Sequence, residues 1–271
     1  MTRSASASAP HHPLACILAY APRERARTLL RSAFPKRKGR LLLTRASADF
    51  ADTMCTTLVD AAVVDLVAAQ DDAWHAVALA REFPSTPFFG LVSLRPGDGP
   101  ALAHCAASEF TDVLVDTVDM TVIRELVVRE CFSTRFAKAL EDPPPALALE
   151  TPLQRAAWRC MVAGGGRRVN TSDMARELRV TREHLSRSFA ADGAPNLKRV
   201  IDFVRLLAAA ELAKNPGHDL QDVACMLGFA SSSHLSTTAQ RIAGTRPTSL
   251  ARLRTVDLVG RFVRGHGRSR G

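Results

Sequence analysis

Short apolar runs alternate with amphipathic stretches over the first half of the chain. The apolar runs predict five strands, over 14–20, 40–44, 61–66, 87–94 and 111–115. Between them the apolar residues recur with helical spacing, which predicts helices near 23–32, 48–56, 72–81 and 100–108. Near-continuous apolar strands that alternate with helices are typical of a parallel sheet covered on both faces. We therefore expect residues 14–140 to form an α/β domain of the flavodoxin-like, doubly wound class.

The last predicted helix of this half, over 118–140, carries more apolar surface than one packing face needs. Consecutive prolines after Asp142 cannot continue a helix and end the domain there. One apolar stripe must cover the sheet, and the second should find a partner. We expect that partner to be another copy of the chain, with Val122 and Leu126 in the dimer interface. The alternative is that the second stripe packs on the C-terminal half.

The second half of the chain predicts only helices and turns. A helix over 152–162 ends at three consecutive glycines, and a helix over 196–213 ends at Asn215-Pro216-Gly217. The expected organisation is a disordered tail over 1–13, the α/β domain over 14–140, a Pro-rich linker over 141–151, an all-α domain over 152–254 and a flexible basic tail over 255–271.

One short pattern occurs twice in the all-α domain, at 174–189 and at 223–236. Each copy has a small Ala inside a short apolar-periodic helix, then a turn, then a hydroxyl residue that can cap a second helix. These residues are Ala175 and Thr181 in the first copy and Ala224 and Ser231 in the second. Two helices that cross steeply need a small residue at their contact, and one face of the second helix stays free to enter a major groove. The pattern therefore predicts two helix-turn-helix units in tandem.

The positive charge is concentrated in the half that carries this repeat. The formal net charge is +9, yet residues 1–150 hold 16 Lys and Arg against 18 Asp and Glu, whereas residues 151–271 hold 20 against 9. Such a basic half suits contact with phosphates. The six cysteines form no CxxC and no Cys/His cluster along the sequence. We expect no metal, no cofactor and no disulfide, and a cytoplasmic protein without a membrane segment.

Over about 160–254 the sequence is similar to the DNA-binding domain of the AraC/XylS family of transcription regulators. The matching residues include Ala175, Leu178, Thr181, Leu185 to Arg187, Phe189, Arg205-Leu206-Leu207, Ala224, Gly228-Phe229, Ser231, Ser233, Leu235 and the closing Gly244-Thr245-Arg246-Pro247. Arg179 stands where the first turn of the family usually has Gly. Leu235 and Ala239 replace large aromatics of the second unit, so we expect that unit to pack less tightly and to grip DNA more weakly.

The resemblance also implies which side chains contact DNA. If Leu185 and Phe189 face the core, four residues of the first unit point outward, namely Arg182, Glu183, Ser186 and Arg187. Arg182 takes a phosphate role and the other three take base-contact roles, with Arg187 suited to a bidentate guanine contact. The corresponding face of the second unit holds Ser232, Ser233, His234, Ser236 and Thr237. These short side chains without formal charge suit the recognition of phosphates and DNA shape.

The α/β half resembles the receiver domain of bacterial response regulators. Asp65 ends the third strand, where that family carries its phospho-acceptor, and Ser93 holds the family's hydroxyl position. The remaining chemistry is missing, because Ala21-Pro22-Arg23 replaces the acidic pair that holds magnesium and Asp116 stands approximately at the family's lysine. Phosphoryl transfer needs a divalent ion and cations that neutralise the transferred group. We therefore expect a pseudo-receiver.

Together these patterns predict a transcription regulator that binds double-stranded DNA in a promoter or operator. The pseudo-receiver would serve dimerisation or signal input, and a homodimer and RNA polymerase are the expected protein partners. The alternative is an orthodox response regulator phosphorylated at Asp65. An enzyme is not expected, because the GxGxxG, P-loop, GxSxG and HExxH patterns are missing from the sequence.

Overall fold

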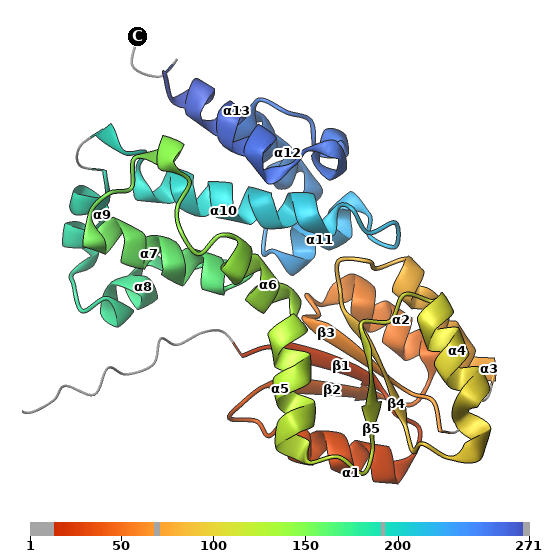
Figure 1. The fold of residues 1–271 in the computed structure, drawn as a ribbon. Helices are drawn as coiled ribbons and strands as arrows, with labels where there is room; N and C mark the ends of the chain where they lie inside the picture. The colour runs from red at the N-terminus through yellow and green to blue at the C-terminus, as the bar shows by residue number, and fades with distance from the viewer. Residues whose placement is uncertain (1–13, 68–70, 191–192, 268–271) are drawn as a thin grey trace, which may run out of the picture.

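The computed structural model describes residues 14–67, 71–190 and 193–267. Its N-terminal half is a parallel sheet of β1 (Cys16–Tyr20), β2 (Arg40–Thr44), β3 (Ala61–Asp65), β4 (Phe88–Val92) and β5 (Asp112–Val115). The strand order β2-β1-β3-β4-β5 is the flavodoxin-like, doubly wound order (Figure 1). The five predicted strands and the fold class are confirmed. The disorder predicted over 1–13 lies outside the described residues.

Helices cover both faces of this sheet. One face carries α1 (Glu24–Ala33) and α5 (Met120–Glu130), and the other carries α2 (Ser47–Thr56), α3 (Asp71–Ala78) and α4 (Gly99–Ala107). The 3-10 helices η1 (Leu79–Arg81) and η2 (Pro96–Asp98) follow α3 and precede α4. Alternate residues of β1 divide between the two cores, as the period of two in a strand requires. All residues of β1 and β3 are buried, as their near-continuous apolar character predicts.

The single helix predicted over 118–140 is wrong. The chain breaks at Cys131, whose φ of −48° and ψ of 141° are not helical, and this residue separates α5 from α6 (Phe132–Ala139). The backbone carbonyl of Asp60 accepts from Phe132 N–H at 2.8 Å, and its Oδ1 accepts from Ser133 N–H at 3.1 Å. These bonds satisfy amides that begin α6 and would otherwise lack an intrahelical partner.

The break also accounts for part of the second apolar stripe. Ile123 and Val127 of α5 pack on the sheet, whereas Phe132 and Phe136 of α6, followed by Leu140, are buried in the core of the C-terminal half. Packing on that half was the alternative to a dimer interface, and it explains the apolar residues of α6. It does not explain why Val122 of α5 is exposed.

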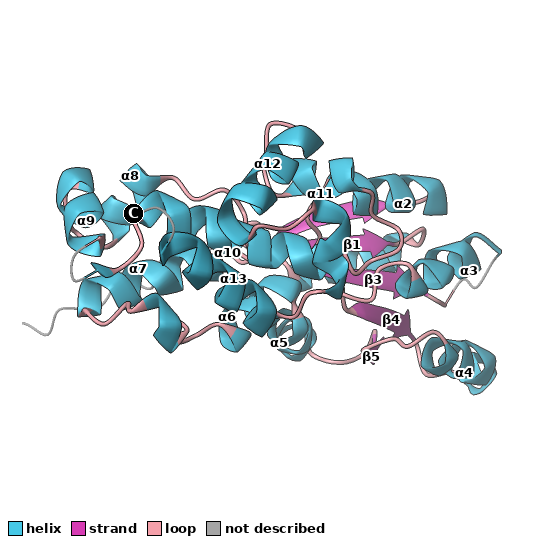
Figure 2. Cartoon of the chain, turned by 90° about the horizontal axis from the view of Figure 1, so that it is seen from above, coloured by secondary structure: helices cyan, strands magenta, loops and turns pink. Residues whose placement is uncertain are grey.

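The C-terminal half is built around one almost wholly buried helix, α10 (Leu197–Leu212). One end of it carries α7 (Pro152–Ala163), α8 (Thr171–Glu177) and α9 (Arg182–Phe189), and the other end carries α11 (Leu220–Met226) and α12 (Ser232–Ala243) (Figures 1 and 2). The 3-10 helix η3 (Pro145–Leu147) precedes α7. Among these helices α7, α11 and α12 pack directly on α10, and α9 packs on α7. The two ends of α10 therefore set the spacing of the repeated motifs.

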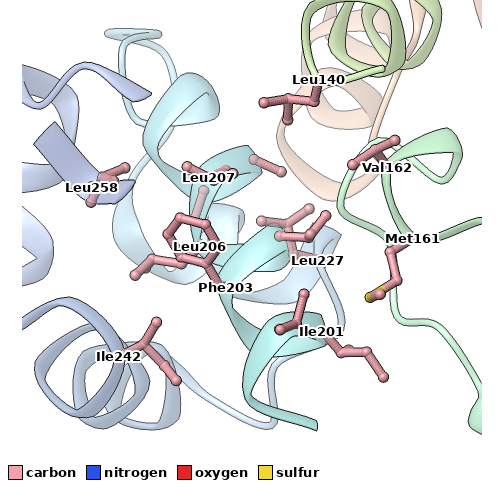
Figure 3. Close-up of a cluster of buried hydrophobic side chains, with 14 of the residues drawn as sticks. Leu140, Met161, Val162, Ile201, Phe203, Leu206, Leu207, Leu227, Ile242 and Leu258 are labelled. Carbon is pink, nitrogen blue, oxygen red and sulfur yellow. The ribbon is translucent and has the colours of Figure 1, made fainter. Parts of the chain in front are cut away.

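The core of this half forms between α10 and the helices around it. Figure 3 shows Phe203 and Leu206 of α10 among side chains from the flanking helices, including Val162 and Ile242. Trp158 of α7 is fully buried, and its Nε1 donates to the carbonyl of Leu140 at 2.7 Å. This bond gives the one polar atom of a large apolar side chain its partner, as burial of Trp requires.

Residues 255–267 form a packed helix instead of the flexible tail predicted from their basic composition. This helix, α13 (Thr255–Gly267), follows the 3-10 helix η5 (Pro247–Arg252). Phe262 is fully buried and stacks on Phe203, with ring centroids 4.3 Å apart. Arg199 lies 4.7 Å above the same ring and donates to the Phe262 carbonyl at 3.1 Å. Aromatic stacking and a cation–π contact therefore attach α13 to α10.

A buried ion pair joins the two halves. The carboxylate of Asp60, just before β3, is fully buried, and its Oδ2 accepts from Arg167 Nη2 and from Cys16 N–H, both at 2.7 Å. Arg167 follows α7, and it also donates to the carbonyl of Leu58 at 3.0 Å. One guanidinium of the helical half thus reaches two residues that precede β3.

A second group of contacts joins the loop before β4 to the end of α10. Ser85 N–H donates to Asn215 Oδ1 at 2.8 Å, and Ser85 Oγ donates to the carbonyl of Glu211 at 2.9 Å. Gly217 lies so close to Phe83 that an added Cβ would come within 2.5 Å of the ring. These contacts and those of Asp60 all lie at the amino ends of the strands. The helical half therefore covers the end of the sheet at which the strands begin, opposite their carboxyl ends.

Arg167→Ala is expected to destabilise the chain, because it removes the cation beside the buried Asp60 carboxylate. Breaking a buried pair costs about 3–5 kcal/mol, and the partial exposure of Arg167 reduces the expected loss to about 2–3 kcal/mol. Urea unfolding followed by circular dichroism measures the change. Arg168→Ala is the matched control, since this neighbour is exposed, and it should stay within about 0.5 kcal/mol of the original chain. Equal stability of the two variants would contradict the role of Arg167.

Candidate nucleic-acid interface

The first repeated motif forms the helix pair α8 and α9. Thr181 caps α9, because its Oγ1 accepts from His184 N–H at 3.1 Å. Ala175 is buried in α8, where the small side chain lets the two helices approach. Leu185 and Phe189 of α9 are fully buried. The predicted cap, small residue and core positions of the first unit are therefore all present.

The turns of the two units close with the same backbone bond. Val180 N–H donates to the carbonyl of Ala175 at 3.0 Å in the first unit, and Phe229 N–H donates to the carbonyl of Ala224 at 2.8 Å in the second. Each turn has one residue in the left-handed region, Arg179 with a φ of +56° and Gly228 with a φ of +69°. This bond satisfies a carbonyl at the end of the first helix. Arg179 thus holds a conformation that favours glycine.

The exposed face of α9 carries all four side chains predicted for it. Leu185 and Phe189 turn one face into the core, and the residues left exposed include Arg182, Glu183, Ser186 and Arg187. The four side chains come from the first turns of an eight-residue helix. Two cations, one carboxylate and one hydroxyl are therefore presented together to the solvent.

The second recognition helix, α12, begins in the same way. Ser231 Oγ accepts from His234 N–H at 3.1 Å. Leu235 and Ala239 are fully buried, so these residues occupy the core positions although they are smaller than the aromatics usual in the family. The predicted face is partly covered: Ser233, His234 and Thr237 are exposed, whereas Ser232 and Ser236 are half-buried. Ser236 and Thr237 donate to carbonyls of their own helix at 2.9 and 3.0 Å, which leaves their hydroxyl oxygens as acceptors.

The imidazole of His234 is held against the turn of the second unit. Its Nδ1 accepts from Ala230 N–H at 3.2 Å, and its ring lies edge-on to Phe229 with centroids 5.5 Å apart. Because Nδ1 is the acceptor, the proton of the neutral ring lies on Nε2. His234 therefore has a structural role in the turn and one ring nitrogen left to donate.

Arg205 of α10 supports the same turn from within the core. Its guanidinium lies 3.9 Å from the centre of the Phe229 ring, and its Nη2 donates to the carbonyl of Leu227 at 3.1 Å. Burial lowers the pKa of Arg205, and the nearby Asp202 carboxylate opposes that shift. Asp202 also pairs with Arg241 of α12 at 2.7 Å. The second unit is therefore attached to α10 by charge as well as by packing.

The carboxyl ends of the strands, where a receiver domain would have its phosphorylation pocket, carry an ion pair that the sequence did not predict. Asp65 is fully buried, and Arg23 Nε donates to its Oδ2 at 2.8 Å while Nη2 donates to its Oδ1 at 2.6 Å. The sequence alone indicates Arg23 only as the loss of an acid. Its position directly after β1, the neighbour of β3 in this fold, is the signal that could have identified the pair.

The other two residues of this pocket contact each other. Ser93 Oγ donates to Asp116 Oδ2 at 2.7 Å, and the guanidinium of the largely exposed Arg25 lies 3.8 Å from the same oxygen. Asp116, at the approximate position of the lysine in receiver domains, thus accepts a hydrogen bond from the Ser93 hydroxyl. Arg23, Asp65, Ser93 and Asp116 all lie at the carboxyl ends of the strands.

The two residues predicted for a dimer interface lie on α5. Val122 is 45% exposed, which is unusual for a large apolar side chain, and Leu126 is half-buried against the core under α5. A contact between two copies through these residues stays a prediction.

Comparison with known families identifies the repeated motif. Residues 174–252 match the family model described as a helix-turn-helix domain. The matched range contains both units and α10, so the AraC-type DNA-binding domain predicted from the sequence is confirmed. Comparison with curated proteins finds no match. No helix among the described residues is long and apolar enough to cross a membrane.

The chain resembles several solved structures at low sequence identity. Chemotaxis protein CheY4 of Vibrio cholerae is 13% identical with a TM-score of 0.38, over 43% of this chain and 98% of its own. Full-length FixJ from B. japonicum is 14% identical with a TM-score of 0.38, over 83% and 96%. Response regulator DrrB of Thermotoga maritima is 16% identical with a TM-score of 0.37, over 70% and 86%. The receiver-like fold of the N-terminal half follows from its strand order.

Arg179→Gly is expected to stabilise the chain by about 0.5–1 kcal/mol, because glycine adopts the left-handed conformation without the steric cost of a Cβ. Arg176→Gly is the matched control, since the same replacement inside α8 removes an exposed arginine from a helix and should cost about 1 kcal/mol. Urea midpoints of the two variants check the opposite signs. A loss of stability in Arg179→Gly equal to that of Arg176→Gly would contradict the strain at this turn.

Proposed function

We propose that the chain is a sequence-specific transcription regulator that reads DNA with α9 and α12, and that its receiver-like domain acts without aspartyl phosphorylation. The observation that carries the first part is the exposed surface of α9, where Arg182, Glu183 and Arg187 are open to solvent while Leu185 and Phe189 are buried. A helix that follows a helix-turn-helix turn and presents such a face fits the major groove.

Within α9 the chemistry of each side chain suggests its role. Arg187 carries a planar guanidinium that matches the two acceptors of guanine, and Glu183 can accept from the amino group of cytosine. Ser186 can donate or accept at a base edge, and Arg182 at the start of the helix suits a phosphate. The first unit is therefore proposed to supply most of the base discrimination.

The second unit is proposed to contribute through shape and phosphates. Its exposed residues are Ser233, His234 and Thr237, with Ser232 and Ser236 beside them. Their side chains are short, and the His234 ring is tied to the turn. The 16 residues of α10 span about 24 Å, and the recognition helices beyond its ends extend the reach toward the roughly 34 Å repeat of a groove.

Arg187→Ala is expected to weaken binding to the operator by about 1–3 kcal/mol and to relax the preference at one base pair. The operator is first selected from a random DNA pool with the original chain, and competition binding then measures affinity for each single-base variant. Arg159→Ala on α7, which removes an exposed arginine outside the repeated motifs, is the control and should keep the preference. Unchanged sequence preference in Arg187→Ala would refute the assignment.

The second part of the proposal rests on the Arg23–Asp65 pair. A phospho-acceptor must offer its carboxylate to a phosphodonor beside a divalent ion. Here the guanidinium of Arg23 takes both oxygens of Asp65, and no acidic pair follows β1 to hold the ion. Asp116 adds a second carboxylate at the position where the family's cation would lie. The orthodox response regulator is the alternative function.

Asp65→Asn is expected to leave promoter activity of the full-length regulator unchanged, because the proposed mechanism has no phosphoryl step at this residue. A reporter fused to a promoter that the chain regulates measures the response, and mass spectrometry after acetyl phosphate treatment should find no added phosphate. Phosphate on Asp65, with loss of the reporter response in the variant, would favour the orthodox response regulator.

The proposal includes two protein partners. A homodimer through α5 is supported by the exposure of Val122, with Leu126 beside it on the same helix. RNA polymerase is the partner that a regulator of transcription implies. The proposed dimer contact through α5 does not involve α9 or α12, so it leaves the proposed DNA-reading faces free.

A further inference from the structure

Three side chains with metal-binding atoms meet where the receiver-like domain contacts the second helix-turn-helix unit. Cys55 lies in the last turn of α2, His218 lies in the loop before α11, and Asp222 lies in the first turn of α11. One ligand atom from each lies within 4.8 Å of the other two. Figures 1 and 2 both show α11 beside α2. The three residues are 163 and four positions apart in sequence, so folding alone brings them together.

The imidazole of His218 has an unusual environment. Its Nδ1 is buried and has no hydrogen-bond partner among the described residues, and its ring packs against Phe83 with centroids 4.7 Å apart. Burial lowers the pKa of His218, and the carboxylates of Asp222 and Asp219 oppose that shift. A buried polar atom without a partner is costly in a folded protein, and such an atom often has a water or an ion as its partner.

Charge around the cluster favours a cation. Burial raises the pKa of the Cys55 thiol, and four nearby carboxylates act in the same direction, those of Asp222, Asp52, Glu82 and Asp219. A bound divalent cation would reverse this, because it stabilises the thiolate and offsets the negative field. Asp222 uses Oδ2 to accept from Asp219 N–H in the capping box, and its other oxygen is not needed for that bond.

We propose that Cys55, His218 and Asp222 bind a divalent transition metal of the zinc class. One thiolate, one imidazole and one carboxylate are a ligand set that zinc accepts, with water in the fourth position. Ligand atoms of a tetrahedral zinc site lie about 3.5 Å apart, given metal–ligand distances of about 2.0–2.3 Å. The side chains must therefore close by about 1 Å on binding, which rotations about their χ angles can supply. Binding releases the Cys55 proton to solvent.

The metal would tie the receiver-like domain to the second DNA-reading unit. Cys55 belongs to α2, whereas Asp222 belongs to the helix that precedes α12. A metal that holds both helices would fix the position of α12 relative to the sheet of the receiver-like domain, which is the domain on which a signal would act. The proposal does not depend on whether the chain binds DNA, because its test measures the metal alone.

Cobalt(II) absorption of the full chain, stripped of metal with a chelator, tests the site. We expect one Co²⁺ per chain, with the thiolate-to-cobalt absorption of a sulfur ligand and d–d bands of a tetrahedral site, and displacement of both by Zn²⁺. Cys55→Ser should abolish the thiolate band and weaken binding more than about tenfold. Asp222→Asn keeps the sulfur and an oxygen that can cap α11, and it should weaken binding by a similar factor.

Cys225→Ser is the matched control, because Cys225 lies exposed on α11, outside the cluster. It should keep the band and the affinity of the original chain. Circular dichroism confirms that each variant is folded. A chain that binds no Co²⁺ saturably, a thiolate band that survives in Cys55→Ser, a band lost in Cys225→Ser, or unchanged affinity in Asp222→Asn would each overturn the proposal.

Discussion

The buried carboxylate of Asp60 is the point on which the arrangement of this molecule depends. It lies just before β3 and receives the Cys16 N–H of β1, the Ser133 N–H at the start of α6 and the guanidinium of Arg167. A buried charge is tolerated only when it is paired and hydrogen-bonded. One side chain therefore joins the amino ends of β1 and β3, fixes the break between α5 and α6, and attaches the helical half.

The two ends of β3 carry related ion pairs with different consequences. At the amino end Asp60 binds an arginine from the helical half, and at the carboxyl end Asp65 binds Arg23 of its own domain. The first pair joins the domains, and the second occupies the carboxylate that would accept a phosphoryl group in a receiver. Fold and site are separate properties, so a receiver-like fold does not by itself require receiver chemistry.

The contact of the helical half with the amino ends of the strands also affects the position of the second helix-turn-helix unit. The end of α10 and the loop before α11 contact Ser85, Phe83 and Cys55. The first unit, at the other end of α10, lies away from the sheet (Figure 1). The two proposed recognition helices therefore differ in environment: α9 packs within the helical half, whereas α11, which precedes α12, contacts α2 of the receiver-like domain.

The sequence by itself determined the local elements and the repeated motif. Strand and helix periodicity is a property of neighbouring residues, so the five strands, the caps Thr181 and Ser231 and the buried Leu185 and Phe189 could be predicted. Contacts between distant residues have no such periodicity. The break at Cys131 depends on Asp60, the order of α13 depends on Phe203, and the pairing of Asp65 depends on Arg23 reaching it from the end of the neighbouring strand β1. The approach of Cys55 to His218 and Asp222 likewise exists only once α11 has docked on α2. Only the tertiary structure decided these features, because each depends on which surfaces meet after the local elements have formed.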